Sequence, residues 1–113
     1  MAQRILIIQG HPASDSLCAG LASAYAEGAH AAGAEVRWLR LGEMDFDPLL
    51  HAGYRDAQPL EPDLVAAQAA MVWAEHLVCV YPVWWGAMPA LLKGFIDRVF
   101  LPGFAFRYRS GSS

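Results

Sequence analysis

Two adjacent tryptophans after an apolar segment are the clearest chemical signal in this chain. Residues 77–81 form the apolar run, and Pro82 ends it just before Trp84 and Trp85. Backbone N–H and C=O groups in a turn of this kind are not used by a sheet, so a ligand can bond to them. The flat indole faces can stack on an aromatic ring. We therefore predict that the second turn, residues 82–86, holds a planar ring, and we expect a flavin.

The same tryptophans also allow a purely structural interpretation, in which they belong to the core or to a dimer contact. For Trp84 we give this interpretation at least equal weight, whereas for Trp85 we favour contact with a ligand. A third aromatic group follows, in which Phe104, Phe106 and Tyr108 alternate as they would on an extended segment. That segment is either a strand packed on the core or one wall of a pocket.

The first turn, residues 10–15, leads from an apolar run into a predicted helix that begins at Leu17. A helix start carries unpaired N–H groups and about half a positive charge, which makes it a site for phosphate. Ser16 and His11 can add hydrogen-bond donors. Alternatively, Ser16 is only the N-cap and His11 is a surface residue. Neither GxGxxG nor GxxxxGK[ST] occurs, which argues against a dinucleotide-binding Rossmann domain and a P-loop enzyme.

Strand-like and helix-like segments alternate along the chain, which predicts an α/β fold with a doubly wound parallel sheet. We expect strands at residues 5–8, 35–41 and 77–81, and helices at residues 17–32, 62–75 and 89–100. In parallel sheets, ligands bind beyond the carboxyl ends of the strands. Both turns follow a strand, so we expect them to meet at this edge.

Composition narrows the functional classes. The 113 residues suit a single domain, residues 1–113, with 56% hydrophobic and only 17% charged residues, against about 25% charged in ordinary domains. The net charge of −3 and the lack of a basic cluster argue against nucleic acid. No stretch approaches the roughly 18 apolar residues of a membrane span, and no signal-peptide pattern opens the chain, so we expect a cytoplasmic protein. Cys18 and Cys79 show no metal spacing and are interpreted as buried free thiols, so we predict no metal site.

Four segments together resemble the flavodoxin-like NAD(P)H:quinone oxidoreductases, also called NAD(P)H dehydrogenases (quinone). They are residues 5–11, 16–18, 44–48 and, most specifically, 81–100. The resemblance implies a five-stranded sheet in the order 2-1-3-4-5, a homodimer and a bound flavin, either FAD or FMN. It also implies a ping-pong reaction in which NAD(P)H delivers a hydride to the flavin and a quinone or similar acceptor then takes two electrons.

The resemblance assigns roles to individual residues. Four of them would lie at the flavin phosphates: His11, Ser16, Leu17 and Cys18. Five would line the flavin ring: Pro82, Val83, Trp84, Trp85 and Gly86. The aromatic pair Phe106 and Tyr108 would reach the substrate pocket across the dimer interface. The catalytic residues remain unknown, because family members supply them from a later part of the chain.

The chain stops at residues 109–113, where the family would continue with a fourth strand. We therefore expect a C-terminally incomplete domain with strands 2-1-3 present and strands 4-5 missing. Two other functions stay open: a flavodoxin-like electron carrier, and a flavin-binding ancillary subunit of the kind that regulates potassium efflux. A response regulator is disfavoured, because residues 9–11 replace the acidic pair that such a protein needs.

Overall fold

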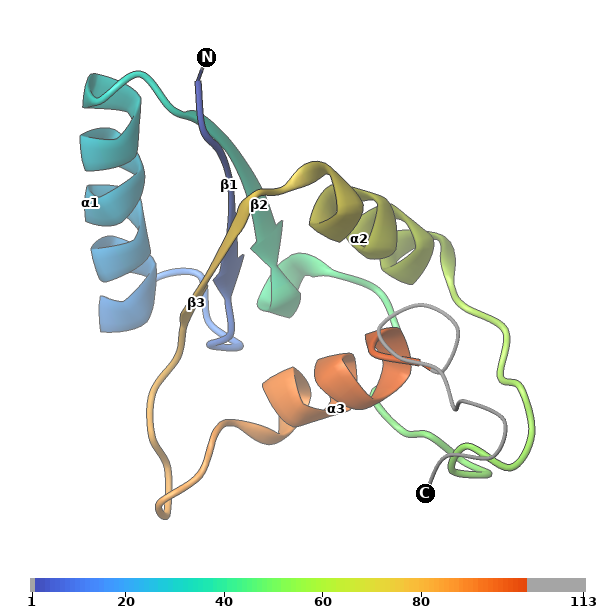
Figure 1. The fold of residues 1–113 in the computed structure, drawn as a ribbon. Coiled ribbons are helices and arrows are strands. Elements are labelled where there is room, and N and C mark those ends of the chain that lie inside the picture. The colour runs from blue at the N-terminus through green and yellow to red at the C-terminus, as the bar shows by residue number, and fades with distance from the viewer. Residues whose placement is uncertain (1, 102–113) are drawn as a thin grey trace, which may run out of the picture.

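The computed structural model describes residues 2–101, which form three parallel strands and three α-helices (Figure 1). The elements are β1 (Arg4–Gln9), α1 (Leu17–Ala31), β2 (Glu35–Arg40), the 3-10 turn η1 (Leu41–Glu43), α2 (Pro62–Trp73), β3 (His76–Val80) and α3 (Ala90–Val99). Each predicted element is present, and all of the element ends lie within two residues of their predicted positions.

The strands are ordered β2-β1-β3, and both pairs are parallel. β1 lies in the centre, where Ile5 and Ile8 are 5% exposed and Leu6 and Ile7 are fully buried. A strand covered on both faces needs apolar side chains at successive positions, which explains the unbroken run. The predicted α/β fold and the order 2-1-3 are therefore confirmed.

Helices cover both faces of the sheet (Figure 1). On one face, Ile5 and Ile7 pack with Ala22 and Ala26 of α1. On the other face, the core joins side chains of β1 to those of α2 and α3, and its buried members include Leu6, Ile8, Leu64, Ala67, Leu92, Phe95 and Val99. Because successive strand residues point to opposite faces, one short run of β1 anchors both layers.

The ends of the helices follow local rules. Ser16 caps α1, and just after the helix Gly33 adopts φ +87, the left-handed conformation that commonly ends a helix. α2 ends at Trp73, two residues before the predicted end. The Glu75 N–H instead donates to the Arg4 carbonyl at 2.8 Å, so the chain joins the sheet at His76.

The prediction that both cysteines are buried was wrong. Cys79 is exposed, and Cys18 is only partly buried, although both are free thiols as expected. On α1, Leu17, Leu21 and Tyr25 are exposed, because the smaller Ala22 and Ala26 face the sheet. Within the described residues, β3 pairs only with β1, so its other edge carries no neighbour. Among residues 2–101, no helix has both the length and the apolar character needed to cross a bilayer.

Candidate cofactor-binding site

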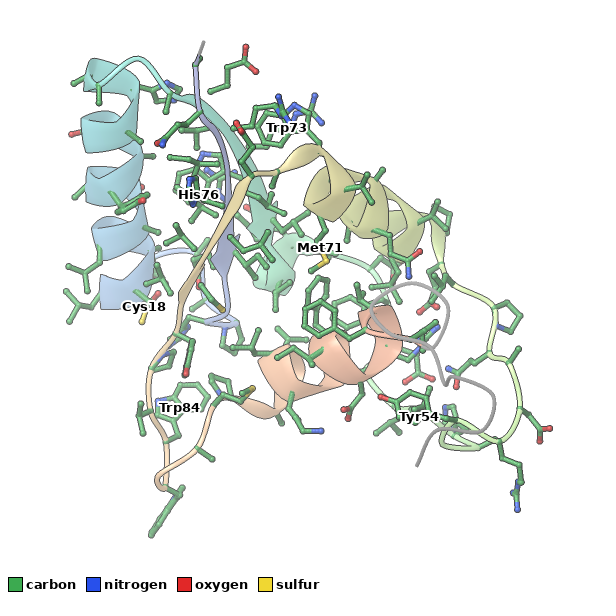
Figure 2. The ribbon with its side chains drawn as sticks, viewed as in Figure 1. Cys18, Tyr54, Met71, Trp73, His76 and Trp84 are labelled. Carbon is green, nitrogen blue, oxygen red and sulfur yellow. The ribbon has the colours of Figure 1, made fainter. Side chains whose placement is uncertain are left out.

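The first turn and the second turn lie together at the carboxyl edge of the sheet. The Gly10 N–H donates to the Val80 carbonyl at 2.8 Å, which ties the end of β1 to the end of β3. Beyond this bond the rings of His11 and Trp84 meet edge to face, with centroids 5.3 Å apart and planes at 80°. Figure 2 shows Trp84 and Cys18 at this same end of the molecule. The predicted meeting of the two turns is therefore confirmed.

A buried glutamine shapes the first turn. Gln9 Oε1 accepts the His11 N–H at 2.5 Å, and Gln9 Nε2 donates to the Ala13 carbonyl at 3.4 Å. The Ala13 N–H in turn donates to His11 Nδ1 at 2.9 Å. Because Nδ1 accepts, the proton of the neutral ring is on Nε2.

The start of α1, which follows the first turn, also offers hydrogen-bond donors. Ser16 Oγ accepts the Ala19 N–H at 3.2 Å, so the hydroxyl acts as the N-cap and keeps its own proton to donate. Among the residues described, no hydrogen bond uses the N–H groups of Leu17 and Cys18. Leu17 is 80% exposed, so it leaves this helix end open to solvent. Two free N–H groups and a positive helix end are what an anionic group requires.

The second turn closes in a two-residue hairpin. Trp84 and Ala87 exchange two backbone hydrogen bonds, of 2.8 and 3.0 Å. Between them, Trp85 has φ 55 and Gly86 has φ 74, the positive pair that marks a type I′ turn. Glycine is common in this conformation, whereas a bulky side chain is an outlier and marks strain.

The side chains of the second turn face solvent. Trp85 is fully exposed at 103%, and Val83 is 69% exposed, while Pro82 is partly buried. Trp84 is 44% exposed and contacts His11. These exposures exclude the interpretation of Trp85 as a core residue. Within the described residues, no hydrogen bond uses the backbone N–H groups of Val83, Trp85 and Gly86.

Close backbone contacts fix the first turn in place. A Cβ on Gly42 would lie 2.0 Å from the Pro12 carbonyl oxygen, so the segment after β2 touches the turn directly. A Cβ on Gly10 would lie 3.0 Å from Leu92 of α3. Neither contact was predicted from the sequence, and neither was the role of Gln9. The available signal for Gln9 was a polar residue at the end of an otherwise apolar strand.

A buried arginine fastens the long loop before α2 onto α3, the helix that follows the second turn. Arg98 is fully buried, and its Nη2 donates to Glu61 Oε1 at 2.6 Å and to the Pro59 carbonyl at 2.9 Å. Its Nη1 donates to the Asp47 carbonyl at 2.5 Å. The hydrogen bond from Arg98, with a second from the Asp47 N–H, lowers the pKa of Glu61 from 4.5 to about 2. One turn earlier on α3, Gly94 leaves room for the same loop.

Comparison with known proteins agrees with this fold. Residues 3–113 match the family described as Flavodoxin-like fold, and the chain belongs to that family. Its strand order, β2-β1-β3, follows the doubly wound pattern of such proteins.

The similar proteins carry oxidoreductase names. A Haemophilus influenzae protein named uncharacterized NAD(P)H oxidoreductase is 34% identical over 112 residues, which cover 96% of this chain and 55% of that protein. NAD(P)H dehydrogenase (quinone) 1 of Cavia porcellus is 30% identical, over 94% of this chain and 46% of its own length. The chain therefore spans about half the length of these relatives.

A solved structure gives the same picture. The NAD(P)H:quinone oxidoreductase from Methanothermobacter marburgensis superposes with a TM-score of 0.82 at 29% identity. The match covers 96% of this chain and 58% of that one. Phe106 and Tyr108, predicted to reach a substrate, lie outside the described residues.

Proposed function

We propose that this chain is the amino-terminal part of a flavin-dependent oxidoreductase that carries two electrons from NAD(P)H to a quinone or a similar acceptor. The observation that carries the proposal is the contact between His11 and Trp84, which joins the first turn, leading into the open start of α1, to an aromatic turn. The names of the relatives support the choice of electron donor and acceptor.

The two turns fit the two ends of a flavin. The free N–H groups of Leu17 and Cys18, with the hydroxyl of Ser16 and Nε2 of His11, suit its phosphate. The unused N–H groups of Val83, Trp85 and Gly86 suit the polar edge of its ring, and the exposed indole of Trp85 gives that ring a stacking surface. Pro82 and Trp84 complete the proposed site. Trp84 contacts the His11 ring edge to face and so links the second turn to the first.

A bound flavin would supply the two-electron chemistry, and the residues of this chain would bind and orient it. Donors fixed by the backbone keep their geometry when the ligand arrives, so little ordering is left to oppose binding.

The rest of the proposal concerns the whole protein. We propose a cytoplasmic homodimer in which residues 1–113 belong to one domain, and in which a later segment supplies strands 4-5 and the catalytic groups. The length of the relatives supports this arrangement, since the chain covers 55% and 46% of them. In this dimer Phe106 and Tyr108 would contact the acceptor.

The direct test is to purify the complete protein, release any cofactor and identify it by mass. We expect about one flavin per chain, together with NAD(P)H oxidation that depends on an added quinone. A protein that binds flavin but oxidises neither NADH nor NADPH would instead support the electron carrier or the ancillary subunit. A colourless protein that binds neither FAD nor FMN would contradict the proposal.

A further inference from the structure

Gln9 is buried to an extent that is unusual for an amide side chain. It is only 2% exposed, and it ends the apolar run of β1 directly below the first turn. Burying an amide is unfavourable unless its donors and acceptor are bonded. Both ends of this amide bond to the first turn, Oε1 to the His11 N–H and Nε2 to the Ala13 carbonyl. The side chain therefore acts on the turn and has no other hydrogen-bond partner among the described residues.

These bonds set the state of the His11 ring. Gln9 holds residues 11 and 13 in the geometry in which the Ala13 N–H reaches His11 Nδ1 at 2.9 Å. An occupied Nδ1 leaves the ring proton on Nε2, at the opposite side of the ring. Trp84 meets the ring edge to face, which limits its rotation. The imidazole is thus fixed by the first turn on one side and by the second turn on the other.

We propose that Gln9 is a positioning residue that keeps His11 as the Nε2–H tautomer, ready to donate to an anionic phosphate group. The proposal deepens the function above and rests on it, because the phosphate is that of the flavin. Gln9 itself does not touch the ligand.

The chemistry of the amide explains why glutamine stands at this position. Leucine or methionine would fill the same space but leave the His11 N–H and the Ala13 carbonyl without partners. A carboxylate could accept from His11 but could not donate to Ala13. Only an amide of this length offers one donor and one acceptor to two points of the turn.

The test compares Gln9→Met with Gln68→Met in the full-length protein. Gln68 is a matched control, since its Nε2 also donates to a backbone carbonyl, that of Val99 at 3.1 Å, but on α2, away from both turns. Imidazole ¹⁵N shifts report the His11 tautomer without any ligand. Titration with FAD, FMN and ADP reports affinity for the phosphate-bearing group.

We expect the native protein and Gln68→Met to show the Nε2–H tautomer, and Gln9→Met to show a mixture of the two tautomers. Affinity should fall about fivefold to tenfold in Gln9→Met, because the hydrogen bond from His11 Nε2 to the phosphate would be lost or weakened, and it should change less than about twofold in Gln68→Met.

A native His11 with its proton on Nδ1 would overturn the proposal, even if Gln9→Met failed to fold. So would a folded Gln9→Met with an unchanged tautomer and unchanged affinity. If the native protein shows the Nε2–H tautomer, lost in Gln9→Met, but binds no flavin, then the positioning role stands and the flavin assignment fails.

Discussion

Trp85 has a backbone conformation that few side chains of its size adopt. Its φ of 55 lies in the left-handed region, and its indole is fully exposed. This conformation costs a residue with a Cβ about 1–2 kcal/mol, and no burial of the ring offsets the cost. Strained residues of this kind gather at binding sites, where the ligand supplies the missing contacts. We infer that the role of Trp85 is to offer its exposed indole ring to a ligand.

This inference predicts that stability and binding change in opposite directions in Trp85→Asn. Asn-Gly is the preferred pair for a type I′ turn, so the free energy of unfolding should rise by about 0.5–1 kcal/mol. Flavin affinity should fall severalfold to tenfold, because a stacking partner is lost. Denaturant unfolding and flavin titration measure the two effects. Val72→Asn, at a 75% exposed position on α2, should leave flavin affinity unchanged.

At the level of single residues, the sequence indicated only part of the candidate site. The residue types of His11, Ser16 and Trp85 suggested them as candidates, because each carries a group that a flavin can use. Gln9 was missed because its partners are backbone atoms two and four positions away, and a turn brings them within reach only once folded. A hydrogen bond of this kind leaves no pattern in the sequence.

At the level of elements, tight glycine contacts hold the turns. Gly42 lies against the Pro12 carbonyl, so the segment after β2 packs directly against the first turn. Replacing it with alanine would place a methyl group 2.0 Å from a backbone oxygen, and the turn would have to move. The neighbouring α1 contains a different glycine, Gly20, which has open space around it.

We therefore predict opposite effects for two glycine-to-alanine changes. Gly42→Ala should lower the free energy of unfolding by about 1–3 kcal/mol and weaken flavin binding. Gly20→Ala should raise it by up to about 1 kcal/mol, because alanine favours the helix. Urea unfolding of both variants measures the difference. Equal effects would show that the contact at Pro12 does not constrain the turn.

The loop held by Arg98 allows a second test at this scale. Arg98→Met removes the hydrogen bonds to Glu61, Pro59 and Asp47. This change should lower the free energy of unfolding by about 3 kcal/mol. That value is at the low end for breaking a buried ion pair, because Glu61 stays partly hydrated. Lys93→Met breaks the exposed pair with Asp97, at 2.5 Å, and should change stability by less than about 1 kcal/mol. A similar loss in both variants would contradict the proposed anchor.

At the scale of the whole molecule, the same anchor makes stability depend on pH. Glu61 has its pKa lowered from 4.5 to about 2, first by the Arg98 hydrogen bond and then by the Asp47 N–H. A lowered carboxyl pKa stabilises the fold fully above the unfolded value. We expect that stability to decline as the pH falls from 4.5 towards 2. Chemical unfolding at several pH values should show a shallower decline in Glu61→Gln than in Glu35→Gln, an exposed control on β2.

The order of the sheet and its two-layer core were predictable, because the fully apolar β1 and the alternation of elements constrain the topology strongly. The burial pattern of α1 and the exposure of Cys79 were not. Small alanines face the sheet while Leu17, Leu21 and Tyr25 face outward, so the largest apolar side chains do not mark the buried face of this helix. For Cys79, exposure depends on whether a neighbour covers β3, and no single strand encodes that.

The central claim is that one ligand contacts both turns at once. Hydrogen exchange of the complete protein, followed by mass spectrometry with and without flavin, tests this claim most directly. We predict that flavin slows exchange in peptides that cover residues 9–18 and in those that cover residues 80–89. In both segments the slowing should increase together as the fraction of protein with bound flavin increases. Slowing in only one of these segments, or at another edge of the sheet, would contradict a shared site.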